Sequence, residues 1–244
     1  MLQIQHLEKT YKNAVEPSLR GLSLSFSTTC IAGLLGPNGA GKTTTISILC
    51  GLVKADSGAA SLLGLDVIKD AEAIKKRIGV VPQSIALYPT LTAVENFQYI
   101  GKLYGLSSSV LKSRITHYLQ IFGLEKSAQK AIRYYSGGMK RRANIIASLL
   151  HEPELLILDE PTAGVDVQSR NMILQFLQEY HQMGHGIVYT SHLLEEAQQL
   201  CDEIAIIDHG QLVVQGRPKE LMQNQQAGSL EQVFLQLTGS SLRD

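Results

Sequence analysis

Residues 36–44 read Gly36-Pro37-Asn38-Gly39-Ala40-Gly41-Lys42-Thr43-Thr44. This stretch fits the pattern G-x-x-x-x-G-K-[ST] of a phosphate-binding loop. The apolar run Cys30 to Leu35 precedes it as a buried strand would, and the run from Thr43 to Leu49 has no breaker and predicts a helix. Strand, glycine loop and helix is the context that this motif requires. We therefore predict that the nine residues bind the phosphates of a nucleoside triphosphate.

Each part of this loop has a physical reason. Glycines at 36, 39 and 41 allow backbone conformations that are closed to residues with a side chain, so the N–H groups can turn inward around an anion. The following helix adds the positive end of its dipole. Lys42 is expected to reach the β- and γ-phosphates, and the Thr43 hydroxyl to bind Mg²⁺. The alternative is an ordinary glycine-rich turn, but it leaves the flanking strand and helix unexplained.

The composition excludes several classes of protein. The 244 residues suffice for one large α/β domain or for a core with a subdomain, and 44% hydrophobic residues are typical of a globular protein. The 22 basic and 22 acidic residues balance, whereas nucleic-acid-binding domains normally carry a basic surplus. We therefore expect no nucleic-acid partner.

No targeting or membrane segment is predicted. No apolar run approaches the ~20 residues that span a bilayer, and residues 1–6 lack the charged and apolar regions of a signal peptide. We expect a cytoplasmic chain whose membrane role, if any, needs a separate partner. The isolated cysteines Cys30, Cys50 and Cys201 are predicted to be reduced core thiols.

Alternating apolar residues predict strands near both ends of the chain. Leu2, Ile4 and His6 fall on one face of the first run, which favours an edge strand, and a second alternating run ends at Phe26. Residues 51–68 carry two glycines around a short apolar run and predict a hairpin, as do residues 204–214. The remainder from Arg217 predicts two short amphipathic helices separated by a glycine.

A β-branched strand, residues 78–81, ends at a proline and is followed at once by Gln83. A glutamine there is usually a surface loop residue, but in a phosphate-loop protein its amide could bind the metal and the attacking water. Thr92 and Glu95 form a capping box. Helical spacing then continues, which predicts that residues 86–150 form a helical insert between strands of the core.

Ser136, Gly137, Gly138 and Met139 follow this insert and open an apolar-faced helix. Ser136 is a good N-cap, and two glycines leave the first N–H groups unobstructed. Two interpretations remain: a capped helix with a basic surface patch, or a second anion site at a helix N-terminus.

Two acidic residues, Asp159 and Glu160, end a continuous apolar run that is typical of a parallel strand. Ligands in such sheets bind beyond the strand C-termini, and acids there are costly unless they meet a cation or water. We predict that Asp159 holds Mg²⁺ and that Glu160 orients and deprotonates water; a solvated strand end is the alternative. His192 ends another predicted strand, so the same argument applies to it.

Tyr11 lies about 25 residues ahead of the loop. A lone tyrosine is usually packing, but here it could offer a flat platform on which a base stacks.

The order of these motifs resembles that of the ATP-binding subunit of ABC transporters, and the resemblance covers essentially the whole chain. It implies an α/β P-loop NTPase of the ABC ATPase fold, with a mixed sheet core, an antiparallel β layer and an inserted α-helical subdomain. The implied divisions are one domain over 1–244, with a RecA-like catalytic core and β layer at 1–85 and 151–216, a helical subdomain at 86–150, and a C-terminal helical extension at 217–244.

The resemblance also implies roles. Tyr11 would stack on adenine, Gly36 to Thr44 would hold the phosphates of ATP, and Thr43, Gln83 and Asp159 would hold Mg²⁺. Glu160 would be the general base, with Gln83 and His192 at the γ-phosphate. Residues implied to act on the ATP of a second copy are Ser136, Gly137, Gly138, Met139 and Asp166. The partners implied are a homodimer or pseudo-dimer with another ATPase subunit and a multispan membrane permease as a separate chain. Through this permease the ATPase would lie on the inner face of the cell membrane.

Some positions depart from the commoner family pattern L-S-G-G-Q, because Tyr135 and Met139 replace its outer residues. This version, and the C-terminal run 230–239, resemble the exporter branch that serves drugs, antibiotics, lipids or polysaccharides. Leu87 and Tyr88, in the loop 84–89, are expected to be exposed and to contact the permease. Two other functions stay open: a soluble ABC ATPase that acts on ribosomes or DNA, and a phosphate-loop kinase for a small molecule.

Overall fold

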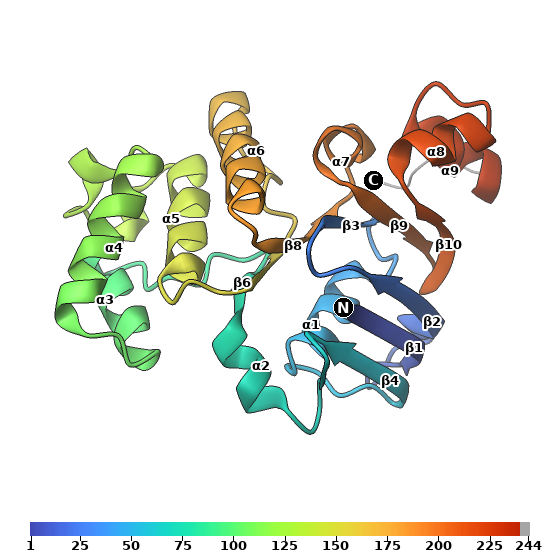
Figure 1. The fold of residues 1–244 in the computed structure, drawn as a ribbon, viewed down its shortest axis with the longest axis horizontal. Coiled ribbons are helices and arrows are strands. Elements are labelled where there is room, and N and C mark those ends of the chain that lie inside the picture. Colours follow the sequence, from blue (N-terminus) through green and yellow to red (C-terminus); the bar gives the residue numbers. More distant parts are fainter. Residues whose placement is uncertain (240–244) are drawn as a thin grey trace.

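The computed structural model describes residues 1–239, whose strands form a four-stranded and a six-stranded sheet (Figure 1). The strands are β1 (Leu2–Lys9), β2 (Leu19–Phe26), β3 (Ile31–Leu35), β4 (Ser57–Leu62), β5 (Leu65–Asp66), β6 (Ile78–Val81), β7 (Leu155–Asp159), β8 (Gly186–Ser191), β9 (Glu203–Asp208) and β10 (Gln211–Gly216). The helices are α1 (Lys42–Leu49), α2 (Ala71–Arg77), α3 (Ala93–Leu103), α4 (Ser108–Ile121), η1 (Glu125–Ser127), η2 (Ile132–Tyr134), α5 (Gly137–Leu149), α6 (Val167–Gln182), α7 (Leu194–Leu200), α8 (Pro218–Asn224) and α9 (Leu230–Thr238).

The larger sheet has the order β10-β9-β3-β8-β7-β6. Its neighbours pair in parallel except β10, which runs antiparallel to β9, so the sheet is mixed. The smaller sheet, β2-β1-β4-β5, is antiparallel throughout. The predicted fold class, a mixed sheet with an antiparallel layer and helices, is confirmed.

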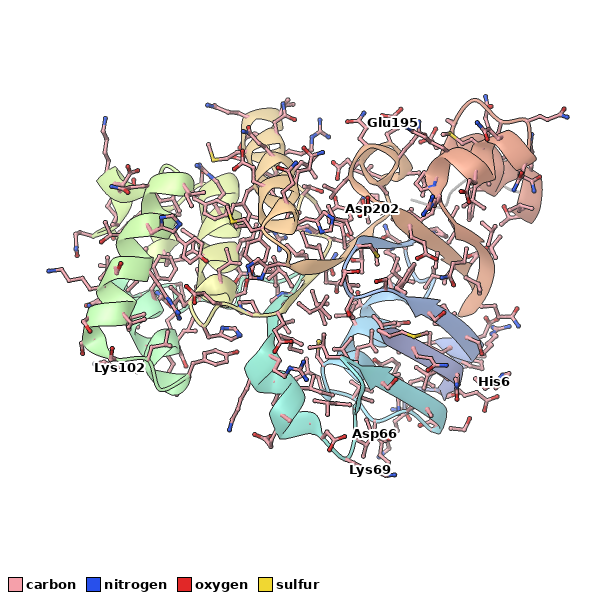
Figure 2. All side chains as sticks on the ribbon, in the orientation of Figure 1. His6, Asp66, Lys69, Lys102, Glu195 and Asp202 are labelled. Atoms are coloured by element: carbon pink, nitrogen blue, oxygen red, sulfur yellow. The ribbon has the colours of Figure 1, made fainter. Side chains whose placement is uncertain are left out.

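The prediction for β1 is wrong in two respects. β1 lies between β2 and β4 and is not an edge strand. A bulge between Ile4 and Leu7 places His6 at φ 47° and turns Leu7 toward the core. His6 is exposed and lies at the margin of the molecule (Figure 2). The facing Gly58 permits this bulge, because a Cβ there would lie 2.3 Å from the carbonyl oxygen of His6.

Side chains of the larger sheet alternate between two buried clusters. In β7, Leu155 and Ile157 join the cluster between the two sheets, to which α1 also contributes. Leu156 and Leu158 join the cluster on the opposite face, which the helices from α3 to α9 cover. Both faces of β7 are therefore buried, as its continuous apolar sequence predicts.

The helices α3, α4 and α5 gather beside the sheets, away from the antiparallel layer (Figure 1). α3 begins with the predicted capping box, in which Thr92 and Glu95 exchange hydrogen bonds. Within residues 1–239 every helix is too short or too polar to cross a bilayer. Residues 240–244 of the predicted C-terminal extension lie outside the described residues.

The loop after β6 differs from expectation at one position. Leu87 was expected to be exposed, but it is 7% exposed and packs in the core beneath the helices. Tyr88 is 52% exposed, as expected, and meets Tyr99 of α3 edge-on with 5.4 Å between ring centroids. Two adjacent apolar residues in a loop give no sequence signal for which side chain turns inward.

Candidate active site

Four parallel strands of the larger sheet end at one edge, and a predicted site residue follows each. The phosphate loop follows β3, Gln83 follows β6, Glu160 follows β7, and His192 follows β8. These strands are neighbours in the order β3-β8-β7-β6, so the four segments lie side by side. The carboxyl edge of a parallel sheet is where such folds bind ligands.

The phosphate loop borders a cavity of about 230 Å³. The residues around the cavity are Ser18, Asn38, Gly39, Ala40, Gly41, Lys42, Thr43, Thr44, Gln83 and Glu160. Most of the predicted loop therefore faces one space together with Gln83 and Glu160. Ser18 was not predicted, because it lies in an irregular segment where the sequence shows no pattern.

Glycine is required at two loop positions for both conformation and space. Gly36 has φ 151°, and a Cβ there would lie 2.1 Å from the backbone oxygen of Ile207. Gly41 has φ 106°, and its Cβ would lie 2.7 Å from the backbone oxygen of Ser18. Residues with a side chain rarely adopt these conformations, so the loop depends on the two glycines.

Lys42, the first residue of α1, folds back over the loop. Its Nζ donates hydrogen bonds to the carbonyl oxygens of Gly36 at 2.8 Å and Pro37 at 3.1 Å. Nζ also lies 3.2 Å from Oε1 of Glu160, and the two side chains are 5% and 7% exposed. Two of the three ammonium protons are therefore donated to the loop's own carbonyl oxygens, and the ion pair with Glu160 adds a third oxygen neighbour. Phosphate oxygens that enter the cavity would compete for these protons.

Glu160 is the residue on which the other side chains converge. Its Oε2 accepts a hydrogen bond from Nε2 of Gln83 at 3.2 Å and lies 3.3 Å from Nδ1 of His192. The histidine contact lacks hydrogen-bond alignment, and Nδ1 is buried with no hydrogen-bond partner among the described residues. A buried polar atom of this kind is typical of a site that a ligand or water completes.

The backbone of Glu160 is held in an unusual conformation. Its φ is 48°, in the left-handed region that residues with a side chain seldom adopt. Its N–H donates to Oγ1 of Thr190 at 2.9 Å, and the same hydroxyl donates to Oδ1 of Asp159 at 2.7 Å. Thr190, in the adjacent strand, thus fixes both acidic residues. Sequence reasoning missed Thr190, because it stands inside a predicted strand without any distinguishing neighbour.

Three predicted metal ligands offer oxygen atoms that suit Mg²⁺. They are the Thr43 hydroxyl, the Gln83 amide and the Asp159 carboxylate. Thr43 and Gln83 line the cavity, and Asp159 is buried. Within the described residues, no group of three or more His, Cys, Asp and Glu could hold a metal by itself. Mg²⁺ usually binds through one or two carboxylates together with substrate phosphates and water, so this sparse oxygen set fits it.

The N-terminus of α5 forms a second group, away from the cavity. Ser136 caps the helix as predicted, since its Oγ accepts a hydrogen bond from the N–H of Met139 at 3.2 Å. Gly138 packs against the start of α6, where its Cβ would lie 2.7 Å from Oδ2 of Asp166. Ser136, Gly137 and Asp166 are exposed. Their shared surface is open to a second chain.

Asp166 is the N-cap of α6. Its Oδ1 accepts a hydrogen bond from the N–H of Ser169 at 2.9 Å, and this bond holds the pKa of the carboxyl below its usual value. The side chain is therefore charged at neutral pH and fixed in orientation, beside the N-terminus of α5.

Arg141 connects the two groups. One interpretation of the basic residues after Ser136 is a surface patch, but Arg141 is only 6% exposed. Its guanidinium donates to the backbone oxygens of Pro82 at 3.0 Å and Gln83 at 2.8 Å. Burial lowers its pKa, and the charges of Asp159 and Glu160 oppose that effect. α5 is thereby tied to the backbone at Gln83.

Tyr11 lies outside the lining of the cavity. Its ring is 41% exposed, and Nζ of Lys9 lies 5.9 Å from the ring centroid. The ring is thus open to stacking, and its role as a platform for a base stays a prediction.

Comparison with known proteins agrees with this geometry. Residues 19–163 match the family described as ABC transporter. The chain is 48% identical over 221 residues to the linearmycin resistance ATP-binding protein LnrL of Bacillus subtilis (strain 168), covering 91% of this chain and 70% of that protein. It is 38% identical to the Nod factor export ATP-binding protein I of Ralstonia nicotianae (strain ATCC BAA-1114 / GMI1000), over 96% of this chain and 72% of that one. A solved ATP-binding subunit of an ABC transporter superposes with a TM-score of 0.87 at 28% identity, covering 98% of this chain and 99% of the other.

Proposed function

Because the chain belongs to the ABC transporter family and is an ATP-binding subunit that hydrolyses ATP, we propose that its Glu160 site supplies the chemistry that drives a separate membrane permease. The observation that carries this proposal is the convergence of Lys42, Gln83 and His192 on Glu160 at the edge of the phosphate-loop cavity. These contacts place an ammonium, an amide and an imidazole beside the carboxylate that is expected to act as the base, and Lys42, Gln83 and Glu160 line or border the cavity where phosphates would bind.

In the proposed reaction, residues 36–44 bind the phosphates, and Lys42 exchanges its contacts with Gly36, Pro37 and Glu160 for phosphate oxygens. Glu160, released from Lys42, accepts a proton from a water molecule that Gln83 helps to orient. His192 contacts the terminal phosphate, and Tyr11 stacks on adenine. Thr43, Gln83 and Asp159 would hold Mg²⁺, which when bound neutralises charge on the phosphates.

We further propose that two ATPase subunits, identical or similar, share each ATP. Ser136 to Met139 of one subunit would cover the ATP bound by the loop of the other, with Asp166 at the same interface. Two observations support this arrangement. The capped N-terminus of α5 is exposed. Among the described residues, those that line the chain's own phosphate-loop cavity include none from the start of α5. A helix N-terminus with free N–H groups favours an anion.

The helical insert, residues 86–150, would contact a multispan permease at the inner face of the membrane and transmit closure to it. The exposed pair Tyr88 and Tyr99 supports a contact there, and Arg141 supplies a rigid link from Gln83 to α5. The relatives' names, one a resistance protein and one an exporter, support export of a drug, antibiotic, lipid or polysaccharide.

The soluble alternatives have less support. An ABC ATPase acting on ribosomes or DNA would favour a basic surface, and the basic and acidic residues here balance. A small-molecule kinase would leave the exposed N-terminus of α5 without a role.

Two measurements test the proposal. The first is the oligomeric state of Glu160→Gln with ATP and with ADP, by size-exclusion chromatography and crosslinking; a dimer with ATP only is expected. The second is purification of the chain from gently solubilised membranes, in which a multispan protein is expected to accompany it. Monomers under both nucleotide conditions, or transfer of phosphate to a small molecule in place of its release, would overturn the proposal.

A further inference from the structure

Glu196, on α7, is a buried acidic residue that the proposed reaction does not use. Its side chain is 9% exposed, although burying a carboxylate is costly unless it is paired and hydrogen-bonded. Oε2 accepts hydrogen bonds from the hydroxyls of Thr162 at 2.7 Å and Tyr189 at 2.5 Å. Oε1 lies 3.4 Å from Nη1 of Arg170. The carboxylate is therefore fully engaged by three other segments of the chain.

These partners lie close in sequence to the residues proposed to act in hydrolysis and at the interface. Thr162 lies two residues after Glu160, and Arg170 lies in the first turn of α6, where its N–H donates to the backbone oxygen of Asp166 at 2.9 Å. Glu196 itself lies four residues after His192. One carboxylate thus ties Thr162, inside the segment 160–166, and Arg170, just after this segment, to the helix that follows His192.

The segment needs such support, because Glu160 has a positive φ of 48°. Residues with a side chain keep this conformation only where the surrounding structure over-determines it. Thr190 holds the N–H of Glu160 on one side. The Thr162–Glu196 bond holds the chain two residues further on. Burial and the charge of Glu196 raise the pKa of Tyr189 well above its usual value, so its hydroxyl stays protonated and donates.

We propose that Glu196 is a positioning residue: it fixes the segment 160–166 against α7, so that Glu160 points at the attacking water and Asp166 points at the partner subunit. The inference rests on the proposed function, since it assigns the base to Glu160 and the interface to Asp166. Glu196 touches neither nucleotide nor water in this scheme and acts through Thr162 and Arg170.

The test compares Glu196→Ala and Thr162→Val with the matched control Glu195→Ala. Glu195 is the neighbouring acid on α7, but it is exposed and lies at the outer side of the helix (Figure 2). Thr162→Val keeps the side-chain volume and removes one hydroxyl, so it serves if Glu196→Ala fails to fold. Glu196→Gln keeps an oxygen for both hydroxyls, but its NH2 group replaces the oxygen that faces Arg170, so it serves as a partial rescue.

The kinetic expectation is a loss in kcat with little change in ATP affinity. Misplacement of a catalytic group by about 1 Å can cost ~10²-fold, so we expect kcat to fall about 10- to 100-fold in Glu196→Ala and less in Thr162→Val. KM for ATP should stay within about threefold, because the phosphate loop is untouched. Glu196→Gln should recover part of the rate through the Thr162 contact, and Glu195→Ala should match the unaltered protein.

Hydrogen exchange gives a readout that does not need hydrolysis. Amides of residues 160–166 should exchange faster in Glu196→Ala and Thr162→Val than in Glu195→Ala, without nucleotide. Unchanged exchange in both variants, or faster exchange with unchanged kcat, would overturn the inference. Failure of the proposed function would give other results: the unaltered chain would release no phosphate, or Glu160→Gln would stay monomeric with ATP. In either case hydrogen exchange would still decide whether Glu196 holds the segment 160–166.

Discussion

Nζ of Lys42 lies 3.2 Å from Oε1 of Glu160, and both side chains are almost fully buried. In the protein without nucleotide, the Lys42 ammonium, which is expected to bind phosphates, therefore neutralises the Glu160 carboxylate, which is expected to act as the base. Removing one partner of a buried ion pair leaves an uncompensated charge, which costs more than losing the pair as a whole. The pair consequently links the phosphate-binding residue to the stability of the site.

Lys42→Met tests this link in the protein without nucleotide. We expect its free energy of unfolding to fall by about 3 kcal/mol, since Glu160 would be left buried without its ammonium. The double variant Lys42→Met/Glu160→Gln should recover most of that loss, because no charge remains to be compensated. Chemical denaturation of the two single variants and the double variant measures the coupling. Strictly additive losses would show that the two side chains do not depend on one another.

Glu160→Gln tests the role of the base. The amide keeps the size of the side chain, so ATP binding should remain, while kcat should fall roughly 10²- to 10⁴-fold, the usual contribution of a general base. Phosphate release and nucleotide binding should be measured on the same preparation. Turnover close to that of the unaltered chain would show that another group takes the proton.

Two adjacent glycines at the start of α5 give a matched pair of variants. A Cβ at Gly138 would lie 2.3 Å from Oγ of Ser169 and 2.7 Å from Oδ2 of Asp166, so Gly138→Ala should cost about 1–3 kcal/mol of folding free energy by overpacking. At Gly137 the nearest atom would be 3.8 Å away, so the folding free energy should change by less than about 0.5 kcal/mol.

The same pair separates packing from the proposed interface. In a Glu160→Gln background, Gly137→Ala should weaken the ATP-dependent dimer although the monomer is as stable as before, because the methyl group would stand at the exposed helix N-terminus. Sedimentation with ATP measures the dimer, and thermal unfolding measures the monomer. A dimer of undiminished affinity would remove Gly137 from the shared site.

Much of the fold and the site could be predicted from the sequence, because local patterns coincide with the physics of the elements. The phosphate loop requires φ values at Gly36 and Gly41 that glycine alone adopts readily. Asp159 and Glu160, at the end of β7, follow an apolar run that is typical of a strand buried on both faces. What failed were positions decided by neighbours distant in sequence. His6 is turned outward by a bulge opposite Gly58.

Buried polar residues were the larger omission. Arg141, Thr190 and Glu196 each reach backbone or side-chain partners at least seven residues away, and for Arg141 the separation is 58 residues or more. Helical or strand periodicity reports which face of an element is apolar. It carries no information on which polar side chain finds a partner in another segment, so these residues are visible only in the folded chain.

His151, which follows α5, should make stability depend on pH. Burial lowers its pKa below 6.5. The contact of Nε2 with the backbone oxygen of Ile78, at 2.9 Å, opposes this shift. The ring stacks on Tyr104 with 3.8 Å between ring centroids. As pH falls through about 6.5, the unfolded chain binds a proton that the folded chain does not, so the free energy of unfolding should decrease. His151→Phe keeps the stacked ring without its charge, so its urea midpoint should decrease less between pH 7 and pH 5.5. His117→Asn, at an exposed position on α4, should retain the full dependence; equal slopes in all three proteins would contradict this source of the pH dependence.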